Sequence, residues 1–204
     1  MMTNVRTLAL GASVLILGLW LLAAGNSGAA DDKADVRQAV QKIAEAIEKG
    51  DADQAKMLAG ELAKDDDLEP VMYLMKKREA KGKAKGYFGV GKTPGTIEPD
   101  GIEAKIMNLG KQVKPQKQID KESEALAEMA YRIAAIAEIA QVKPNDKANN
   151  PTKKKQWAEY AGSMRKGADE LAEAAKEKKA PAIKAAASKV YSSCNNCHGD
   201  FRDD

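Results

Sequence analysis

Apolar side chains recur at steps of three and four residues toward the C-terminus of the chain, a spacing that places them on one face of an α-helix. The members of this stripe are Ile183, Ala187, Val190, Cys194, Cys197 and Phe201. Pro181 suits the first turn of such a helix. The stripe contains both cysteines of the chain, and its only histidine, His198, follows directly. One helix face therefore carries three side chains able to hold a cofactor while it packs against the rest of the fold.

The pentapeptide Cys194-Asn195-Asn196-Cys197-His198 has the spacing at which c-type haem is attached. Both thiols would form thioethers with the haem, and the adjacent imidazole would bind the iron. A redox dithiol would follow a strand, and no strand-like run precedes Ser192. A structural zinc site needs four ligands, whereas the chain clusters three and has no second Cys/His pair. The motif predicts one covalent haem c per chain, with Cys194, Cys197 and His198 as its binding residues.

The first thirty residues have the order of an export signal. Arg6 is followed by an apolar run from Leu8 to Ala24 and then by small residues up to Ala30, with no acidic residue. This order is typical of a signal peptide cleaved after Ala30, although the run is also near the length of a retained membrane anchor. Both readings place residues 31–204 outside the cytoplasm, in the periplasm, which suits a covalently attached haem.

Two more long helices are predicted ahead of the C-terminal helix, over about residues 120–142 and 154–178. The apolar stripe of the first contains Leu126, Met129, Ile133, Ile136 and Ala140. The apolar stripe of the second contains Trp157, Tyr160, Met164, Ala168, Leu171 and Ala175. Residues 144–152 and 179–180 break the pattern and connect the helices. Because short connections join antiparallel neighbours, these three helices are expected to run up and down.

The N-terminal part is also helical, in shorter pieces. A stripe from Val36 to Ile47 ends at Gly50, Asp51 caps a second piece, and Pro70 opens a third after an acidic interruption. Residues 81–116 form a Gly/Lys/Pro-rich loop with one short helical candidate from Ile102 to Leu109. No segment alternates as a strand does. The expected fold class is all-α: a single haem-binding domain over residues 31–204, an antiparallel four-helix-bundle-like unit with additional short N-terminal helices.

The segment Gly86–Thr93 matches the phosphate-binding pattern G-x-x-x-x-G-K-[ST]. That site needs a buried strand before the loop and a helix directly after it, with its N-terminus facing the phosphates. A Lys-rich segment precedes the loop here, and Pro94, Gly95 and Pro99 obstruct a following helix. We therefore expect a glycine-rich loop and no nucleotide. The net charge of only +3 gives no sign of the concentrated basic surface that nucleic-acid binding needs.

Three blocks of the chain resemble the cytochrome c′-type (class II) c cytochromes: Trp157 opening the penultimate helix, the run Leu171–Ala175, and Cys194–Arg202. The resemblance covers roughly residues 120–204. It implies an antiparallel four-helix bundle with haem between helices, His198 as the proximal ligand, and electron transfer or small-gas binding. It also implies that Arg202 lies near the proximal pocket or a haem propionate; an ordinary solvated arginine is the other reading.

The N-terminal half departs from the family pattern, since no single long first helix is present and the loop over residues 81–116 is longer than the family needs.

A sixth iron ligand must be Met or Lys or water, or the site is open, because His198 is the only histidine. Six methionines lie outside the signal segment: Met57, Met72, Met75, Met107, Met129 and Met164. In an up-down bundle, the haem end of the last helix lies level with the start of the first and third helices. This level favours Met72 or Met57 as the sixth ligand. Trp157 and Tyr160 fall near the same level, where packing in the core is their simpler role.

Two classes of function follow. An exported electron carrier would have a six-coordinate iron and a redox partner protein that docks transiently. A five-coordinate protein would instead bind or sense a small gas such as nitric oxide or carbon monoxide. An enzyme is not expected, because a haem peroxidase wants a distal acid–base group, commonly His, and no second histidine exists. The sequence leaves a homodimer open.

Overall fold

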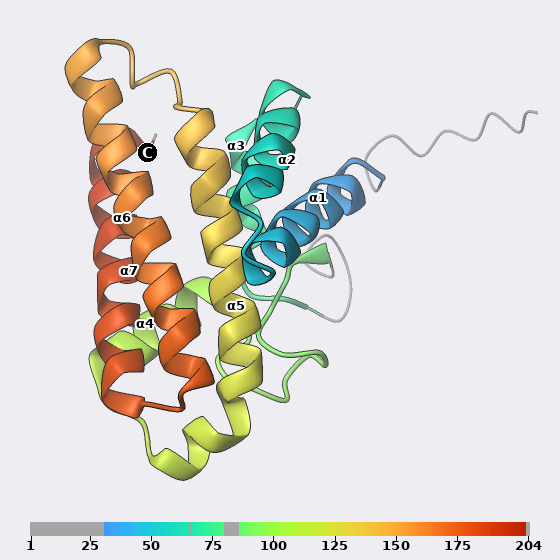
Figure 1. Ribbon diagram of the computed structural model, residues 1–204, viewed down its shortest axis with the longest axis vertical. Coiled ribbons are helices and arrows are strands. Elements are labelled where there is room, and N and C mark those ends of the chain that lie inside the picture. Colours follow the sequence, from blue (N-terminus) through green and yellow to red (C-terminus); the bar gives the residue numbers. More distant parts are fainter. Residues whose placement is uncertain (1–30, 66, 80–85, 203–204) are drawn as a thin grey trace, which may run out of the picture.

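The computed structural model describes residues 31–65, 67–79 and 86–202, and no strand occurs among them (Figure 1). The helices are α1 (Asp31–Glu48), α2 (Ala52–Asp65), α3 (Leu68–Tyr73), α4 (Ile102–Lys111), α5 (Gln116–Val142), α6 (Pro151–Lys176) and α7 (Ala180–Phe201). The all-α class expected from the sequence is confirmed, and so is the short helix that begins at Ile102.

Helices α4 to α7 form a four-helix bundle. Helix α6 packs between α5 and α7, and α4 packs against α7. The first helix of the bundle, α4, has 10 residues, whereas α5, α6 and α7 have 27, 26 and 22. Helices α1 and α2 pack against α5, on the side away from α6 and α7 (Figure 1). The additional N-terminal helices therefore cover the bundle from one side.

The helices begin within a few residues of the positions that the apolar pattern predicts, and side-chain hydrogen bonds cap the starts of α2 and α6. Helix α6 begins three residues earlier, at Pro151, because the side chain of Asn150 accepts a hydrogen bond from the Lys153 N–H at 2.9 Å. The Gln54 N–H donates to Asp51 Oδ1 at 3.0 Å, which confirms Asp51 as the cap of α2. Helix α5 begins four residues early, and α3 begins two residues before Pro70.

The core consists of two clusters of buried apolar side chains. The main cluster joins α1, α2 and α3 to all four bundle helices. Helix α5 is buried on every side from Ile133 to Ala140, since α6 covers one side and the N-terminal helices cover the other. A smaller group, which we call the terminal cluster, consists of Ala140, Ala148, Trp157, Ala161 and Phe201. It fastens the end of α5 and the start of α6 to the end of α7.

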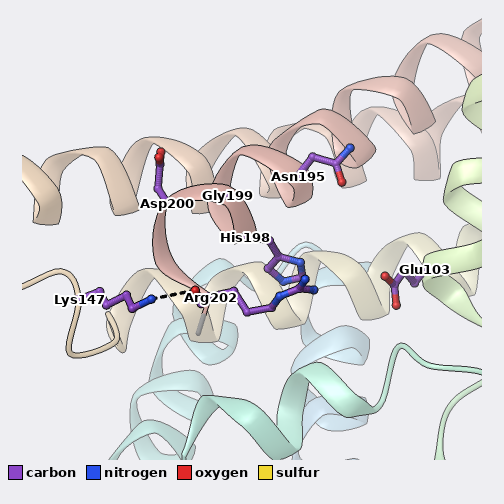
Figure 2. Close-up of a pocket in the computed structure, with 7 residues that line it drawn as sticks. All are labelled: Glu103, Lys147, Asn195, His198, Gly199, Asp200 and Arg202. Atoms are coloured by element: carbon purple, nitrogen blue, oxygen red, sulfur yellow. Dashed lines mark hydrogen bonds between the residues drawn. The ribbon is translucent and has the colours of Figure 1, made fainter. Parts of the chain in front are cut away.

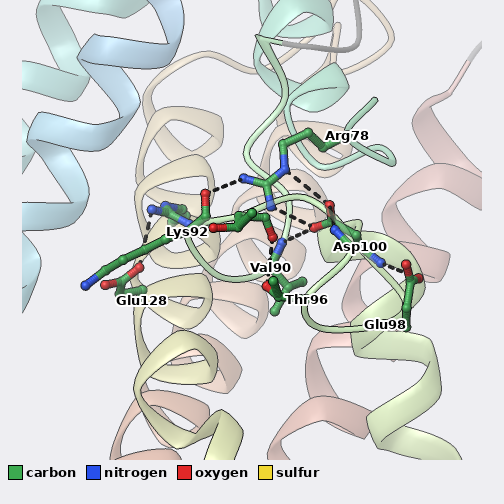
Figure 3. A network of polar contacts seen from close by, with 10 residues as sticks. Arg78, Val90, Lys92, Thr96, Glu98, Asp100 and Glu128 are labelled. Atoms are coloured by element: carbon green, nitrogen blue, oxygen red, sulfur yellow. Dashed lines mark hydrogen bonds and ion pairs between the residues drawn. The ribbon is translucent and has the colours of Figure 1, made fainter. Parts of the chain in front are cut away.

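A loop before α4 is organised by a buried ion pair (Figure 3). Arg78 donates to both carboxylate oxygens of Asp100, from Nε and Nη2, each at 3.2 Å. The backbone N–H groups of Val90 and Gly95 donate to the same carboxylate at 2.7 and 3.2 Å. Gly89 has a φ of +63°, and a Cβ there would lie 2.5 Å from Arg78 Nε, so the turn requires glycine. We call this arrangement the Arg78–Asp100 latch.

The phosphate-loop pattern lies within this loop. No helix follows Thr93 directly, since the chain continues through turns until α4 begins at Ile102. The backbone N–H of Val90, within the pattern, donates a hydrogen bond to the chain's own Asp100 instead of facing a phosphate. The Lys92 side chain is exposed, with Nζ 3.8 Å from Glu124 on α5. The expectation of a glycine-rich loop with no helix after it agrees with this structure.

The described residues contain no helix that combines the length and the apolar character needed to cross a bilayer. The expected export signal, residues 1–30, lies outside the described residues.

Candidate functional site

The last two turns of α7 carry the two cysteines and the histidine at positions i, i+3 and i+4. Cys194 is half-buried against the main cluster, and Cys197 is half-buried against the terminal cluster. His198 is also half-buried, and its imidazole lines a cavity beside α7 (Figure 2). The motif therefore lies where the two apolar clusters meet, with one thiol on each.

Aromatic side chains fix the end of α7 beside the motif. The ring of Phe201 packs edge-on against Trp157, with ring centroids 5.2 Å apart, and against Tyr160 at 6.3 Å. Trp157 Nε1 donates to the Ala140 carbonyl at 2.6 Å, which ties α6 to α5. Trp157 and Tyr160 thus lie at the level of the motif, as the bundle topology predicts, and both pack on the last turn of α7.

The connection between α5 and α6 satisfies the backbone at the end of α7. Asn145 Nδ2 donates to the Phe201 carbonyl at 2.7 Å, and Lys147 Nζ donates to the Arg202 carbonyl at 2.8 Å. The last carbonyl groups of a helix have no hydrogen-bond partner within that helix, so side chains from another segment can donate to them. The last turn of α7 is thereby held in a defined position relative to α5 and α6.

Asp200 joins this end of α7 to α6 by polar contacts. Its Oδ2 accepts hydrogen bonds from the Tyr160 hydroxyl at 2.7 Å and from Gln156 Nε2 at 2.8 Å. The hydrogen bond to Asp200 raises the pKa of Tyr160 above its ordinary value. These two hydrogen bonds hold Asp200, two positions after His198, against α6.

A cavity of about 580 Å³ opens beside the imidazole, within the range of about 300–1,000 Å³ for ligand sites. Its lining residues are Glu103, Lys147, Asn195, His198, Gly199, Asp200 and Arg202. Figure 2 shows Glu103 reaching toward His198 from α4, while the other side is α7. The cavity therefore lies between the start of α4 and the end of α7.

Burial controls the protonation of the three donors. It raises the pKa of both thiols to about 11, helped by Cys197 at Cys194 and by Asp200 at Cys197. The pKa of His198 is lowered, first by burial and then by the positive charge of Arg202, while Glu103 acts in the opposite direction. The folded chain therefore favours neutral thiols and a neutral imidazole, and the neutral imidazole is the form that binds a metal.

The methionines proposed as sixth ligands lie in different surroundings. Met72, on α3, is partly buried and packs against the terminal cluster, which Cys197 also contacts. Met57, on α2, is 56% exposed. Met75, Met129 and Met164 are buried in the main cluster, and Met107 on α4 is partly buried. Among the methionines of the described residues, Met72 is the one that packs against the terminal cluster with Cys197, whereas Met75, Met129 and Met164 share the main cluster with Cys194.

The donor set fits a covalently held haem better than the two alternatives. Two thiols and an imidazole share one helix face. At the cavity, Lys147 and Arg202 supply positive charge that would suit the carboxylates of the haem propionates. A redox dithiol would have a lowered thiol pKa, opposite to the direction found here. Within the described ranges, no group of three His, Cys, Asp or Glu side chains is arranged to hold a metal ion by itself.

The family model for cytochrome c′ matches residues 100–202, which contain α4 to α7 and the whole motif. The chain belongs to the cytochrome c′ family. Membership confirms the resemblance seen in the sequence and makes the protein a haem-binding c-type cytochrome with a four-helix bundle. The match begins at residue 100, about twenty residues before the sequence resemblance, because α4 is the first helix of the bundle. No curated protein and no solved structure gives a significant match.

Two lining residues of the cavity have no signal in the sequence. Glu103 resembles any acidic residue in the first turn of a helix, where the helix dipole favours negative charge. Lys147 resembles any lysine of a polar loop. Both reach the cavity through packing between segments far apart in the chain, which sequence spacing does not describe.

Proposed function

We propose that this protein is an exported electron carrier with one haem covalently attached through Cys194 and Cys197 and bound at its iron by His198. The observation that carries the proposal is the convergence of these three donors on one face of α7, within the part of the chain that matches the family. When bound, the haem supplies a one-electron couple between ferric and ferrous iron. Around it, the chain provides two apolar clusters and a polar cavity on the imidazole side.

Met72 is the sixth ligand in this proposal. Support comes from its contact with the terminal cluster, which Cys197 shares, and from the exposure of Met57 on α2. A thioether ligand favours the ferrous state and raises the reduction potential, as suits a carrier between exported redox proteins. The proposed protein is a carrier and not an enzyme. It exchanges electrons with partner proteins, binds no nucleotide, and can form a homodimer.

Covalent attachment is tested by producing the protein in a bacterium with a cytochrome c maturation system and extracting it with acid and acetone. We expect a mass increase of one haem that survives extraction and is lost in Cys194→Ala/Cys197→Ala. The matched control is Ser192→Ala, at an exposed position in the preceding turn of α7, which should keep the haem. Haem that extracts freely from the unmutated protein would contradict the proposal.

The sixth ligand is tested by absorption spectra of the ferric and ferrous protein, with and without carbon monoxide. A methionine–iron charge-transfer band should be present and disappear in Met72→Ala, while Met57→Ala should leave it unchanged. A high-spin ferric spectrum together with rapid carbon monoxide binding would instead support the gas-binding function and reject the carrier.

Export is tested by cell fractionation and N-terminal sequencing. The arrangement of Arg6 and the apolar run from Leu8 to Ala24 supports a periplasmic protein whose first residue is Asp31, or one held at the membrane by an uncleaved anchor. An uncleaved product found soluble in the cytoplasm would contradict this part of the proposal.

A further inference from the structure

Helix α4 is fixed tightly against α7 along its second half. Gly110 on α4 meets Ser188 on α7 so closely that a Cβ on the glycine would lie 3.3 Å from the serine Cα. The Ser188 hydroxyl donates to the Gly110 carbonyl at 3.0 Å. Glycine at this position allows the two backbones to approach, and the hydrogen bond sets the register between the two helices. The register of α4 on α7 is therefore determined by direct contacts.

The first turn of α4 is fixed as well. The Glu103 N–H donates to the Met75 carbonyl at 3.1 Å, and a Cβ on Gly101 would lie 2.9 Å from Lys77 Cα. Lys105, fully buried, donates from Nζ to Glu122 at 2.7 Å and to the Glu98 carbonyl at 3.0 Å. These contacts hold the backbone of Glu103 in a defined place beside the cavity.

The carboxylate of Glu103 points into this cavity toward His198 (Figure 2). Among the described residues it makes no hydrogen bond or ion pair. Arg202, which carries the opposite charge, lines the same cavity. An unpaired carboxylate on a rigid helix start thus faces the residues that hold the haem.

We propose that the negative charge of Glu103 stabilises the ferric state of the haem iron and, together with the positive charge of Arg202, sets the reduction potential. Ferric haem carries one more positive charge than ferrous haem, so a nearby carboxylate lowers the reduction potential and a nearby guanidinium raises it. This inference rests on the proposed haem attachment at α7. The sequence resemblance implies that Arg202 lies near the haem, whereas Glu103 reaches the cavity only through the packing of α4.

The test is the midpoint potential of the haem-loaded protein in three variants. Glu103→Gln keeps the size and polarity of the side chain and removes its charge, and should raise the ferrous-to-ferric ratio at a fixed electrode potential about tenfold, which is 59 mV for one electron. Glu103→Asp should restore most of the original value. Arg202→Gln should shift the potential in the opposite direction. A side chain with only a structural role would not give shifts of opposite sign that follow charge.

Glu177→Gln is the matched control, since this carboxylate lies just after the far end of α6, roughly 30 Å along the helix from Trp157 by the rise of 1.5 Å per residue. Its midpoint potential should equal that of the unmutated protein. A Glu103→Gln protein with normal haem content and an unshifted potential would overturn this inference and leave the proposed function standing. Absence of covalent haem in the unmutated protein would overturn both.

Discussion

At the scale of single residues, the two cysteines of the motif lie in different surroundings although three positions separate them. Cys194 packs on the main cluster and Cys197 on the terminal cluster. Burial is the largest cause of the raised pKa at both positions, since a thiolate loses hydration in apolar surroundings. The folded chain without haem therefore holds two thiols of low reactivity.

Thiol alkylation of the haem-free protein measures this property. The pKa of each thiol rises from 9.0 to about 11, so the reactive thiolate fraction at neutral pH should fall about 100-fold below that of the unfolded chain. Because the pKa is raised, the rate in the folded protein should climb about tenfold per pH unit up to about pH 11. Iodoacetamide labelling followed by mass spectrometry, with and without urea, gives both rates. Equal rates in the two states would contradict the burial.

At the scale of elements, glycines set how closely the helices approach α7. Gly167 on α6 lies against Val190, where an added Cβ would come within 3.0 Å of the valine Cγ2 and 3.1 Å of its backbone nitrogen. Gly162, also on α6, has no atom within 4 Å of that position. The two glycines share a helix and differ in whether another backbone lies against them.

This difference predicts opposite effects of one substitution. Gly162→Ala should stabilise the protein by about 0.5–1 kcal/mol, because alanine loses less backbone entropy in a helix. Gly167→Ala should destabilise it by about 1–3 kcal/mol, because α6 and α7 must move apart to admit the methyl group. Urea unfolding followed by circular dichroism measures both changes in the free energy of unfolding. Stabilisation by Gly167→Ala would show that the two helices are less tightly packed.

At the scale of the whole molecule, the N-terminal helices and the bundle meet along α5 and through the Arg78–Asp100 latch. Arg78 follows α3 and Asp100 precedes α4, so the pair connects the N-terminal helices to the first helix of the bundle (Figure 3). Nearby, the buried ring of Phe88 contacts the guanidinium groups of Arg37 on α1 and Arg132 on α5, which lie 5.4 and 4.9 Å from its centroid. The loop over residues 86–101 is thus a packed part of the fold.

Breaking the latch should destabilise the protein strongly. Asp100→Asn leaves the Arg78 guanidinium buried without its counter-charge, and loss of one partner of a buried pair costs about 3–5 kcal/mol. The control Glu124→Gln removes an exposed pair with Lys92 and should cost less than about 1 kcal/mol. Urea unfolding monitored by tryptophan fluorescence measures both. Similar small losses in the two variants would show that the latch contributes little.

Local sequence determined most of the helices and the chemistry at the end of α7. The three-and-four spacing of apolar residues located the helices to within a few residues, since each buries one face against neighbours. The spacing of Cys194, Cys197 and His198 placed three donors on one helix face, because that geometry depends only on the turn of the helix itself. The irregular loop at Gly86–Thr93 was also predictable, from its prolines and glycines.

Contacts between distant segments were decided only by the tertiary structure. Glu103 and His198 are far apart in sequence, and their approach depends on the packing of α4 against α7 at Gly110 and Ser188. The partner of Arg78, the position of Met72 beside the terminal cluster and the exposure of Met57 depend on packing in the same way. Helical periodicity tells which face of a helix is buried, but the side chains facing it are chosen by the packing of the whole chain.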